Sequence, residues 1–360
     1  MKNIIKVVFA FITSVSLISS ATAGELSVTG SAKATYNIQG GNVNAAKGIG
    51  ITNEIDFTAS GELDNGYTWN YQVQMDPSDA GAGNIDDTKL TLSTPYGTLG
   101  FFVSEGGLDV DNKASQSVYG RPTDIGVSSG IQDSFDIGSY NNIQLHTPAG
   151  LLPFGTSVKF AYATGDDTTI NAGNAGGAQQ DIYGTGAQQL QITASPIDGL
   201  SIGADYFEQN GAGDGASQVV QNGESGSIFA SYATGPVSVG VSVSAKAPLI
   251  LGGAGAVTAI SNATTAGANK DGVRHFKTKK ASIAFNVNDN LSLSYEEERS
   301  GRSLIEGTAS GELEAHAIQA AYTMGGMTLA VSQGTVDAVS YSNSTGASID
   351  QTLFSMSMAF

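Results

Sequence analysis

The sequence contains no cysteine among its 360 residues and only three histidines. The lack of cysteine excludes a disulfide framework, a thiolate nucleophile and a Cys-based metal site. Basic residues are also few, because 16 Lys+Arg stand against 33 Asp+Glu and give a formal net charge of -17. We therefore expect no nucleic-acid partner, which would need a cationic footprint. Charged residues of both signs make up 14%, well below the roughly 25% typical of soluble domains.

Long apolar runs are missing except at the N-terminus. Lys2 and Lys6 there precede a mostly apolar stretch, Val7 to Ile18, and small residues in an A-x-A pattern follow it. This arrangement is typical of a secretory signal peptide. We expect residues 1–23 to be a cleaved signal peptide and residues 24–360 to form one exported domain. No later run approaches the length of about 18 residues that a membrane-spanning helix needs.

The chain is rich in strict alternation between apolar and polar residues. Between Leu26 and Ile38 the apolar and small residues occupy even positions, and Ser, Thr, Lys and Asn occupy odd positions. A period of two predicts β-strands. The same period returns at 51–63, 67–75, 237–243 and 291–295.

The connections between these predicted strands have two lengths. Seven are short turns, at 64–66, 95–97, 146–153, 196–199, 235–236, 288–290 and 324–326. Eight are long polar or glycine-rich stretches that alternate with them, at 39–50, 76–86, 105–134, 164–187, 208–223, 247–272, 299–311 and 333–349. Fifteen connections join sixteen strands.

An even-numbered meander with turns at one end and loops at the other predicts an all-β transmembrane barrel of 16 antiparallel strands. In hydrocarbon every backbone N–H and C=O must pair within the protein, and only a closed sheet has no unpaired edge. The apolar parity then faces lipid. The polar parity faces the lumen and keeps its water continuous.

The final stretch carries the most specific pattern. Phe354, Met356, Met358 and Phe360 share one parity, which would be an aggregation hazard on a soluble edge strand. In a barrel this strand pairs with the first strand. Here the sequence resembles the Gram-negative general porins, of the alphaproteobacterial trimeric type, whose amphipathic last strand ends in Phe. The resemblance also covers residues 24–30, 96–101 and 142–148.

This resemblance implies a passive channel in the outer membrane of a Gram-negative bacterium, with short periplasmic turns and long extracellular loops. It implies a homotrimer, and Gly30, Ala32 and Ala34 offer a small outward face for contact between barrels. It further implies contact with outer-membrane lipid and lipopolysaccharide, and recognition of the C-terminal residues by the barrel-assembly machinery. Small hydrophilic solutes and ions would pass, and no cofactor, metal or catalytic residue is implied.

The resemblance also implies that the third long loop folds into the lumen and narrows it. The matching stretch, residues 105–134, supplies the candidate constriction acids Glu105, Asp109, Asp111 and Asp124. Candidate lumen charges on the wall are Lys33, Lys89, Glu54 and Asp56. The arginine cluster common in the family is missing, since the chain has four arginines in all. With a negative net charge, the sequence predicts weak cation selectivity, which neutralising Asp109, Asp111 and Asp124 should lower.

Other interpretations remain open on the sequence alone. One is a substrate-specific channel, and another is a secreted or surface β-rich adhesin such as a solenoid, although no short fixed repeat is present. An enzyme is not expected, because neither a G-x-S-x-G elbow nor an H-E-x-x-H signature occurs. The basic cluster Lys270, Arg274, Lys277, Lys279 and Lys280 favours contact with lipopolysaccharide phosphates or acidic loops at the membrane rim over a substrate site.

Overall fold

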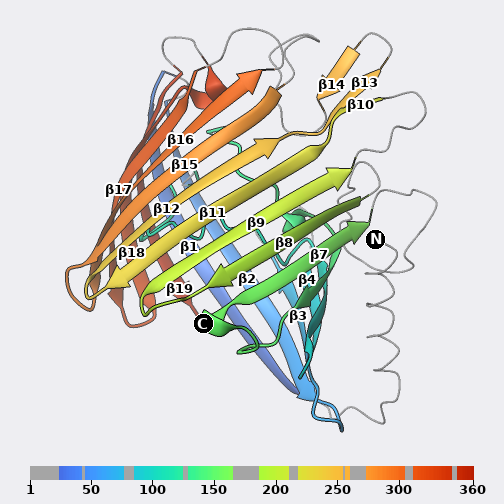
Figure 1. The fold of residues 1–360 in the computed structure, drawn as a ribbon. Helices are drawn as coiled ribbons and strands as arrows, with labels where there is room; N and C mark the ends of the chain where they lie inside the picture. The colour runs from blue at the N-terminus through green and yellow to red at the C-terminus, as the bar shows by residue number, and fades with distance from the viewer. Residues whose placement is uncertain are drawn as a thin grey trace.

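In the computed structural model, the described residues are 24–42, 45–76, 85–124, 129–164, 186–210, 218–253, 256–259, 273–304, 311–342 and 347–360. Sixteen strands close into one antiparallel β-barrel (Figure 1), which confirms the predicted fold class. The β-solenoid interpretation is therefore wrong. The predicted signal peptide lies outside the described residues. Within the part of the chain that the structure describes, no helix has the length and apolar character of a membrane span.

The barrel strands follow one another round the ring in chain order. They are β1 (Glu25–Gly41), β2 (Ala46–Glu62), β3 (Thr68–Met75), β4 (Ile85–Thr94), β5 (Gly97–Val103), β6 (Asn142–His146), β7 (Ser157–Thr164), β8 (Gly186–Ala194), β9 (Leu200–Asn210), β11 (Gly223–Thr234), β12 (Val237–Ala247), β15 (Val273–Asn286), β16 (Leu291–Leu304), β17 (Leu313–Met324), β18 (Met327–Asp337) and β19 (Ile349–Ala359). The described 3-10 helices are η1 (Ile137–Ser139), η2 (Pro153–Gly155) and η3 (Val339–Tyr341).

A small second sheet lies beyond the loop end of the barrel (Figure 1). It pairs β10 (Gln218–Gln221), β13 (Ile250–Gly253) and β14 (Ala256–Ala259) in the order β10-β13-β14. These strands fall in the stretches 208–223 and 247–272, where the sequence predicts only loops. The sheet was missed because the pairing of β10 with β13 joins residues about 30 positions apart and leaves no local signature.

All seven predicted short connections join consecutive strands, as the turns at 63–67 and 325–326 illustrate. The prediction of a long first loop at 39–50 is wrong. Strand β1 continues to Gly41 and β2 begins at Ala46, with Gln39 opposite Ala46 in the register. The paired strands supply hydrogen bonds to each other, and this outweighs the low strand propensity of the glycines in this stretch.

The two faces of the barrel differ as the alternation predicts. Outward-facing Ile228 and Ile318 expose 60% and 61% of their surface. Inward-facing Ser242 of β12 and Gln191 of β8 are buried instead. This is the reverse of a soluble protein, and an apolar exterior is the arrangement that a hydrocarbon environment stabilises.

The first and last strands close the barrel, as predicted. Met358 lies opposite Ala32, and Met356 lies opposite Ala34. The backbone groups of Gly30 and Phe360 exchange two hydrogen bonds of 2.9 Å. A Cβ atom on Gly30 would lie 2.7 Å from a ring carbon of Phe360, so this ring covers the outward surface of Gly30. Gly30 therefore makes room for Phe360 where the barrel closes. Of the small outward face predicted for contact between barrels, only Ala32 and Ala34 remain.

Replacing Gly30 with leucine should impair closure. The added side chain would meet both the Phe360 ring and the Glu54 carbonyl oxygen, each 2.7 Å from the new Cβ. Overpacking of this kind costs about 1–3 kcal/mol. We expect a clear fall in the folded fraction, measured after refolding by heat-modifiable mobility on a gel. Gly301→Leu is the control, because nothing lies within 4 Å of a Cβ there. Equal folded fractions for both variants would contradict a role of Gly30 in closing the barrel.

Candidate functional site

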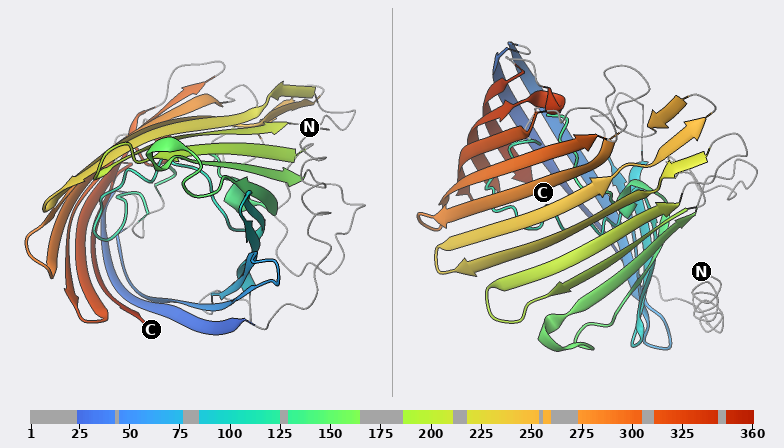
Figure 2. Two further views of the ribbon diagram at one scale, coloured as in Figure 1. Left: turned by 60° about the horizontal axis from the view of Figure 1, so that its bottom comes forward. Right: turned by 45° about the horizontal axis from the view of Figure 1, so that its top comes forward.

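The connection between β5 and β6 lies inside the barrel over its described residues, 104–124 and 129–141 (Figure 2). We call it the inward loop. Its residues meet the wall strands in ring order. Gln191 of β8 donates to the Leu108 carbonyl, and Ser242 of β12 donates to the Asp111 carbonyl, at 2.8 and 2.6 Å. The loop therefore runs around the inner surface of the wall, as the prediction for the third long loop requires.

Polar side chains of the wall bind the backbone of the inward loop. Three loop N–H groups donate at 3.0 Å to wall side chains, namely Gln116 to Ser282, Val118 to Ser294 and Tyr119 to Gln319. These contacts follow β15, β16 and β17 in turn. An irregular chain inside a protein needs such partners for its backbone groups. The inward polar side chains of β15, β16 and β17 therefore bind a loop. From the sequence they were expected only to line a water-filled lumen.

Apolar contacts anchor the same loop. Leu108 and Ile137 pack against Phe207 of β9, and all three are at most 1% exposed. Val110 and Ala114 pack against Phe229 of β11. Sequence reasoning missed these anchors. The sequence carried one signal for them, because Phe207 and Phe229 stand on a parity of their strands that is otherwise polar.

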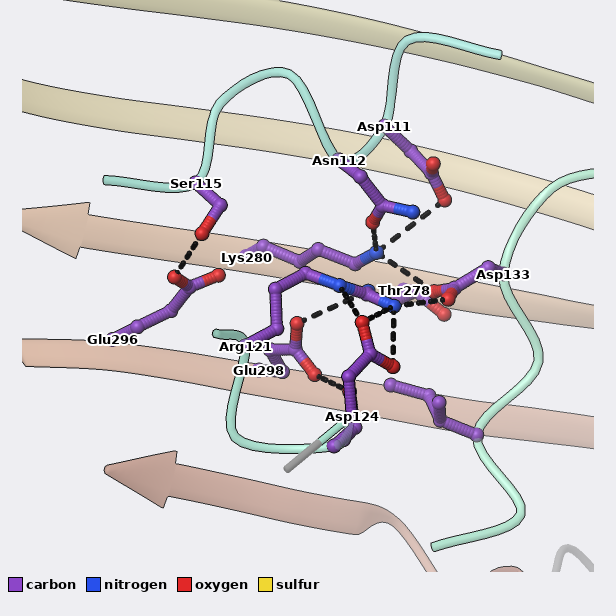
Figure 3. Close-up of polar contacts among 12 residues, drawn as sticks. Asp111, Asn112, Ser115, Arg121, Asp124, Asp133, Thr278, Lys280, Glu296 and Glu298 are labelled. Atoms are coloured by element: carbon purple, nitrogen blue, oxygen red, sulfur yellow. Dashed lines mark hydrogen bonds and ion pairs between the residues drawn. The ribbon is translucent and has the colours of Figure 1, made fainter. Parts of the chain in front are cut away.

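A cluster of charges ties the loop to β15 and β16 (Figure 3). The Arg121 guanidinium contacts Asp124, Asp133 and Glu298 at 2.7, 2.9 and 3.2 Å. The Lys280 ammonium contacts Asp133 and Asp111 at 2.7 and 3.4 Å. We call these six residues, Asp111, Arg121, Asp124, Asp133, Lys280 and Glu298, the charge cluster.

Burial makes the charge cluster sensitive to the loss of its buried members. The side chains of Asp111 and Glu298 are fully buried, and that of Lys280 is 3% exposed. Burial alone would raise the pKa of Asp133, but Lys280 and Arg121 outweigh it and lower the pKa to about 2. A buried charge without its partner is strongly destabilising. The cluster therefore determines where the loop rests on the wall.

Asp109 differs from the other loop acids. Burial, followed by the neighbouring carboxyl groups of Asp111 and Asp136, raises its pKa to about 9. The uncharged form of Asp109 is therefore favoured over that of an ordinary aspartate, which reduces its share of the loop's negative charge. Among the residues that the structure describes, no group of three or more His, Cys, Asp or Glu side chains is placed to hold a metal ion.

Comparison with known families decides the identity of this barrel. A family model described as Gram-negative porin matches residues 8–355. The chain belongs to the Gram-negative porin family. The porin is therefore an outer-membrane protein of a Gram-negative bacterium, and its family and fold indicate a passive channel and not an enzyme. No curated protein matches the chain.

Solved structures of low sequence identity share the fold of the porin. The anion-selective porin from Comamonas acidovorans is 12% identical, with a TM-score of 0.63 over 94% of this chain and 100% of that one. The trimer form of OmpT from Vibrio cholerae is 13% identical, with a TM-score of 0.61 over 94% and 100%. The outer membrane channel DcaP of Acinetobacter baumannii is 13% identical, with a TM-score of 0.63 over 96% and 100%.

The predicted loop acids of the porin have different surroundings. Glu105 is paired with Lys89 of β4 at 2.6 Å, and each side chain keeps about a quarter of its surface exposed. Asp124 is 54% exposed but bound to Arg121. Asp111 is buried within the charge cluster, and the pKa of Asp109 is raised by burial and by neighbouring carboxyl groups. Ion pairing, burial and a raised pKa thus reduce the negative charge that the four candidate constriction acids present to the lumen.

The remaining candidate charges lie on β1 and β2. Lys33 lies over the ring of Tyr119, with 5.5 Å between its ammonium and the ring centre, so the loop reaches the wall at β1. Glu54 lies opposite Ser31, on the same face as Lys33. Asp56 accepts a hydrogen bond of 2.8 Å from Gln72. Arg121 and Lys280 were not predicted as lumen charges, because the contacts that they make between the loop and the wall depend on tertiary structure.

Proposed function

We propose that this porin forms a water-filled channel for passive diffusion of small hydrophilic solutes and ions, with weak preference for cations. The observation that carries the proposal is the closed barrel whose inward loop is anchored to one side of the wall. At the start of the loop, Glu105 and its partner Lys89 of β4 keep about a quarter of their side-chain surface exposed inside the barrel. A polar, hydrated interior of this kind supports diffusion of solutes without a dedicated binding step.

Weak selectivity follows from how the acids are distributed. Glu105 is paired with Lys89, and in the charge cluster the carboxyl groups of four acids share the two cations Arg121 and Lys280, so the loop contributes a part of the negative charge and not all of it. Glu54 and Asp56 on β2 are further acids on the inner wall, and Lys33 lies on the neighbouring strand β1 on the same face. The cation preference therefore rests on the wall carboxylates together with the excess of acids over cations in the charge cluster.

Amide substitution at Glu54 and Asp56 should lower the cation preference. An ion passing about 7 Å from one carboxylate in water gains about 0.6 kcal/mol, so the permeability ratio should fall roughly two- to threefold per charge before screening. The measurement is the reversal potential in a planar bilayer under a salt gradient. Glu224→Gln/Asp337→Asn is the control, since it removes two exposed carboxylates from the outward face. Clear anion preference in the unmodified porin would refute the proposal, as would an inserted barrel without conductance.

We also propose that the porin assembles as a homotrimer and that its C-terminal strand is read by the barrel-assembly machinery. The trimer form of a structure with the same fold supports the first part. Outward exposure of the four C-terminal assembly residues supports the second; they are Phe354, Met356, Met358 and Phe360, at 48%, 40%, 45% and 70%. Openings that occur in threes in the bilayer experiment are expected, and single openings alone would count against a trimer.

A further inference from the structure

The lysines of the barrel wall differ in what surrounds their ammonium groups. On β15, Lys277 and Lys279 are exposed on the outward face, whereas Lys280 is buried on the inward face and belongs to the charge cluster. The predicted basic cluster at 270–280 is therefore divided by the barrel, and Lys270 lies outside the described residues. Lys33 of β1 shows a third arrangement, because it faces inward and its ammonium lies over an aromatic ring of the inward loop.

Tyr119, which supplies this ring, is fixed at its backbone. The Gln319 side chain of β17 accepts a hydrogen bond of 3.0 Å from the Tyr119 N–H and donates one of 2.6 Å to the Gly120 carbonyl. Gln319 is itself only 2% exposed. A buried amide that uses both its oxygen and its nitrogen leaves its partners little freedom to shift. The backbone of Tyr119 is therefore anchored at β17.

The side chain of Tyr119 extends from β17 toward the seam where the barrel closes. The strands follow in the order β17, β18, β19 and β1. The Tyr119 hydroxyl meets the side chain of Ser355 on β19, and the Lys33 ammonium lies 5.5 Å from the centre of the ring. Three strand spacings, about 14 Å, separate β17 from β1. A tyrosine from one side and a lysine from the other therefore span this distance together.

The direction of the Lys33 side chain is not set by its neighbours on the wall. The residues directly opposite Lys33 are Thr52 on β2 and Ser357 on β19, and neither carries a charge. Glu54, two residues along β2 from Thr52, is diagonal to Lys33 on the same face. Diagonal neighbours are within reach of long side chains. The ammonium can thus turn toward the loop or toward β2, and it lies at the loop.

We propose that Tyr119 is a positioning residue for ion selectivity, because its ring holds the Lys33 ammonium at the loop and away from the carboxylates of β2. The face of an aromatic ring attracts an ammonium group within about 6 Å, and more strongly where water is partly excluded. Glu54 and Asp56 then keep their attraction for passing cations. This inference rests on the proposed channel function and its weak cation preference.

The test measures the reversal potential in a planar bilayer under a salt gradient. Tyr119→Leu frees the ammonium to turn toward β2. The permeability ratio of cation to anion should therefore fall roughly twofold, which is the order of effect of one unit charge at about 7 Å in water. Tyr119→Phe retains the ring and should keep the ratio. Tyr140→Leu is the matched control, because this tyrosine of the same loop packs against the apolar anchor around Leu108.

A second background shows whether the effect passes through Lys33. In Lys33→Met no ammonium is left to turn, so adding Tyr119→Leu should leave the permeability ratio unchanged. A displacement of the loop, by contrast, would change the ratio in both backgrounds. If Tyr119→Leu does not fold, Tyr119→Gln takes its place with the same expectation, because it also removes the ring.

Four results would overturn the inference. They are an unchanged ratio in Tyr119→Leu, an equal fall in Tyr119→Phe, an equal fall in Tyr140→Leu, and an equal fall in the Lys33→Met background. Any of them in a conducting, cation-preferring porin leaves the proposed function intact. Absence of conductance or clear anion preference in the unmodified porin refutes the proposed function itself, and this inference with it.

Discussion

Replacing Gly240 with valine should push the inward loop away from its wall and lower the conductance of the porin. Gly240 faces inward on β12, and a Cβ atom there would overlap the carbonyl oxygen of Ala114. Ala114 is 1% exposed and its carbonyl accepts a hydrogen bond of 2.9 Å from Ser282, so the loop has no room to yield sideways. It must move toward the lumen, and overpacking of this kind typically costs about 1–3 kcal/mol.

Single-channel conductance measures this displacement directly. Gly240→Ala should have a smaller effect than Gly240→Val, because the displacement grows with the added volume. Gly48→Val on β2 is the control, since nothing lies within 4 Å of a Cβ at that glycine. An increase in conductance would show that the loop detaches instead of moving inward. An unchanged conductance in a folded Gly240→Val barrel would show that the loop does not set the width of the channel.

Replacing Arg121 with glutamine should loosen the inward loop more than any other single polar change in the charge cluster. The substitution leaves Glu298, which is fully buried, and Asp133 without the guanidinium that pairs them. Breaking a buried ion pair from one side costs about 3–5 kcal/mol. Amide hydrogen exchange in the loop, for example at Val118, should therefore become about a hundredfold faster or more, because exchange follows the population of the open loop.

A second substitution distinguishes the loss of the ion pair from the cost of a buried carboxylate without its partner. Glu298→Gln in the Arg121→Gln background removes the unpaired buried carboxylate and should restore part of the protection. Arg274→Gln is the control, because this arginine is exposed and exposed charges contribute little. Unaltered exchange in Arg121→Gln would mean that the apolar anchors at Phe207 and Phe229 hold the loop without the cluster.

The barrel could be predicted from local features of the chain. Alternation such as that from Leu26 to Ile38 specifies strands with one apolar face, and turn residues such as those at 64–66 specify where the chain reverses. Strand ends were harder to predict. Residues 39–41 and 46–50 look like loop but lie in paired strands, because the hydrogen bonds of a neighbouring strand outweigh weak local preferences.

The candidate site could be predicted only in part. The resemblance placed the third long loop in the lumen, and the parity placed Lys33, Lys89, Glu54 and Asp56 on its inner wall. The state of the loop acids could not be predicted. Asp111 meets Lys280 across 169 positions, and Arg121 meets Glu298 across 177. No local pattern encodes such pairs, which exist only once the ring has closed.

The sequence by itself determined a closed, exported barrel with an apolar exterior, because period-two alternation and turn chemistry act over a few neighbouring residues. Only the tertiary structure decided how the loop lies on the wall and which carboxylates are buried or paired. It also divided the lysines of β15 between the interior and the outer face. The physical reason is that burial and charge pairing depend on which distant strands become neighbours.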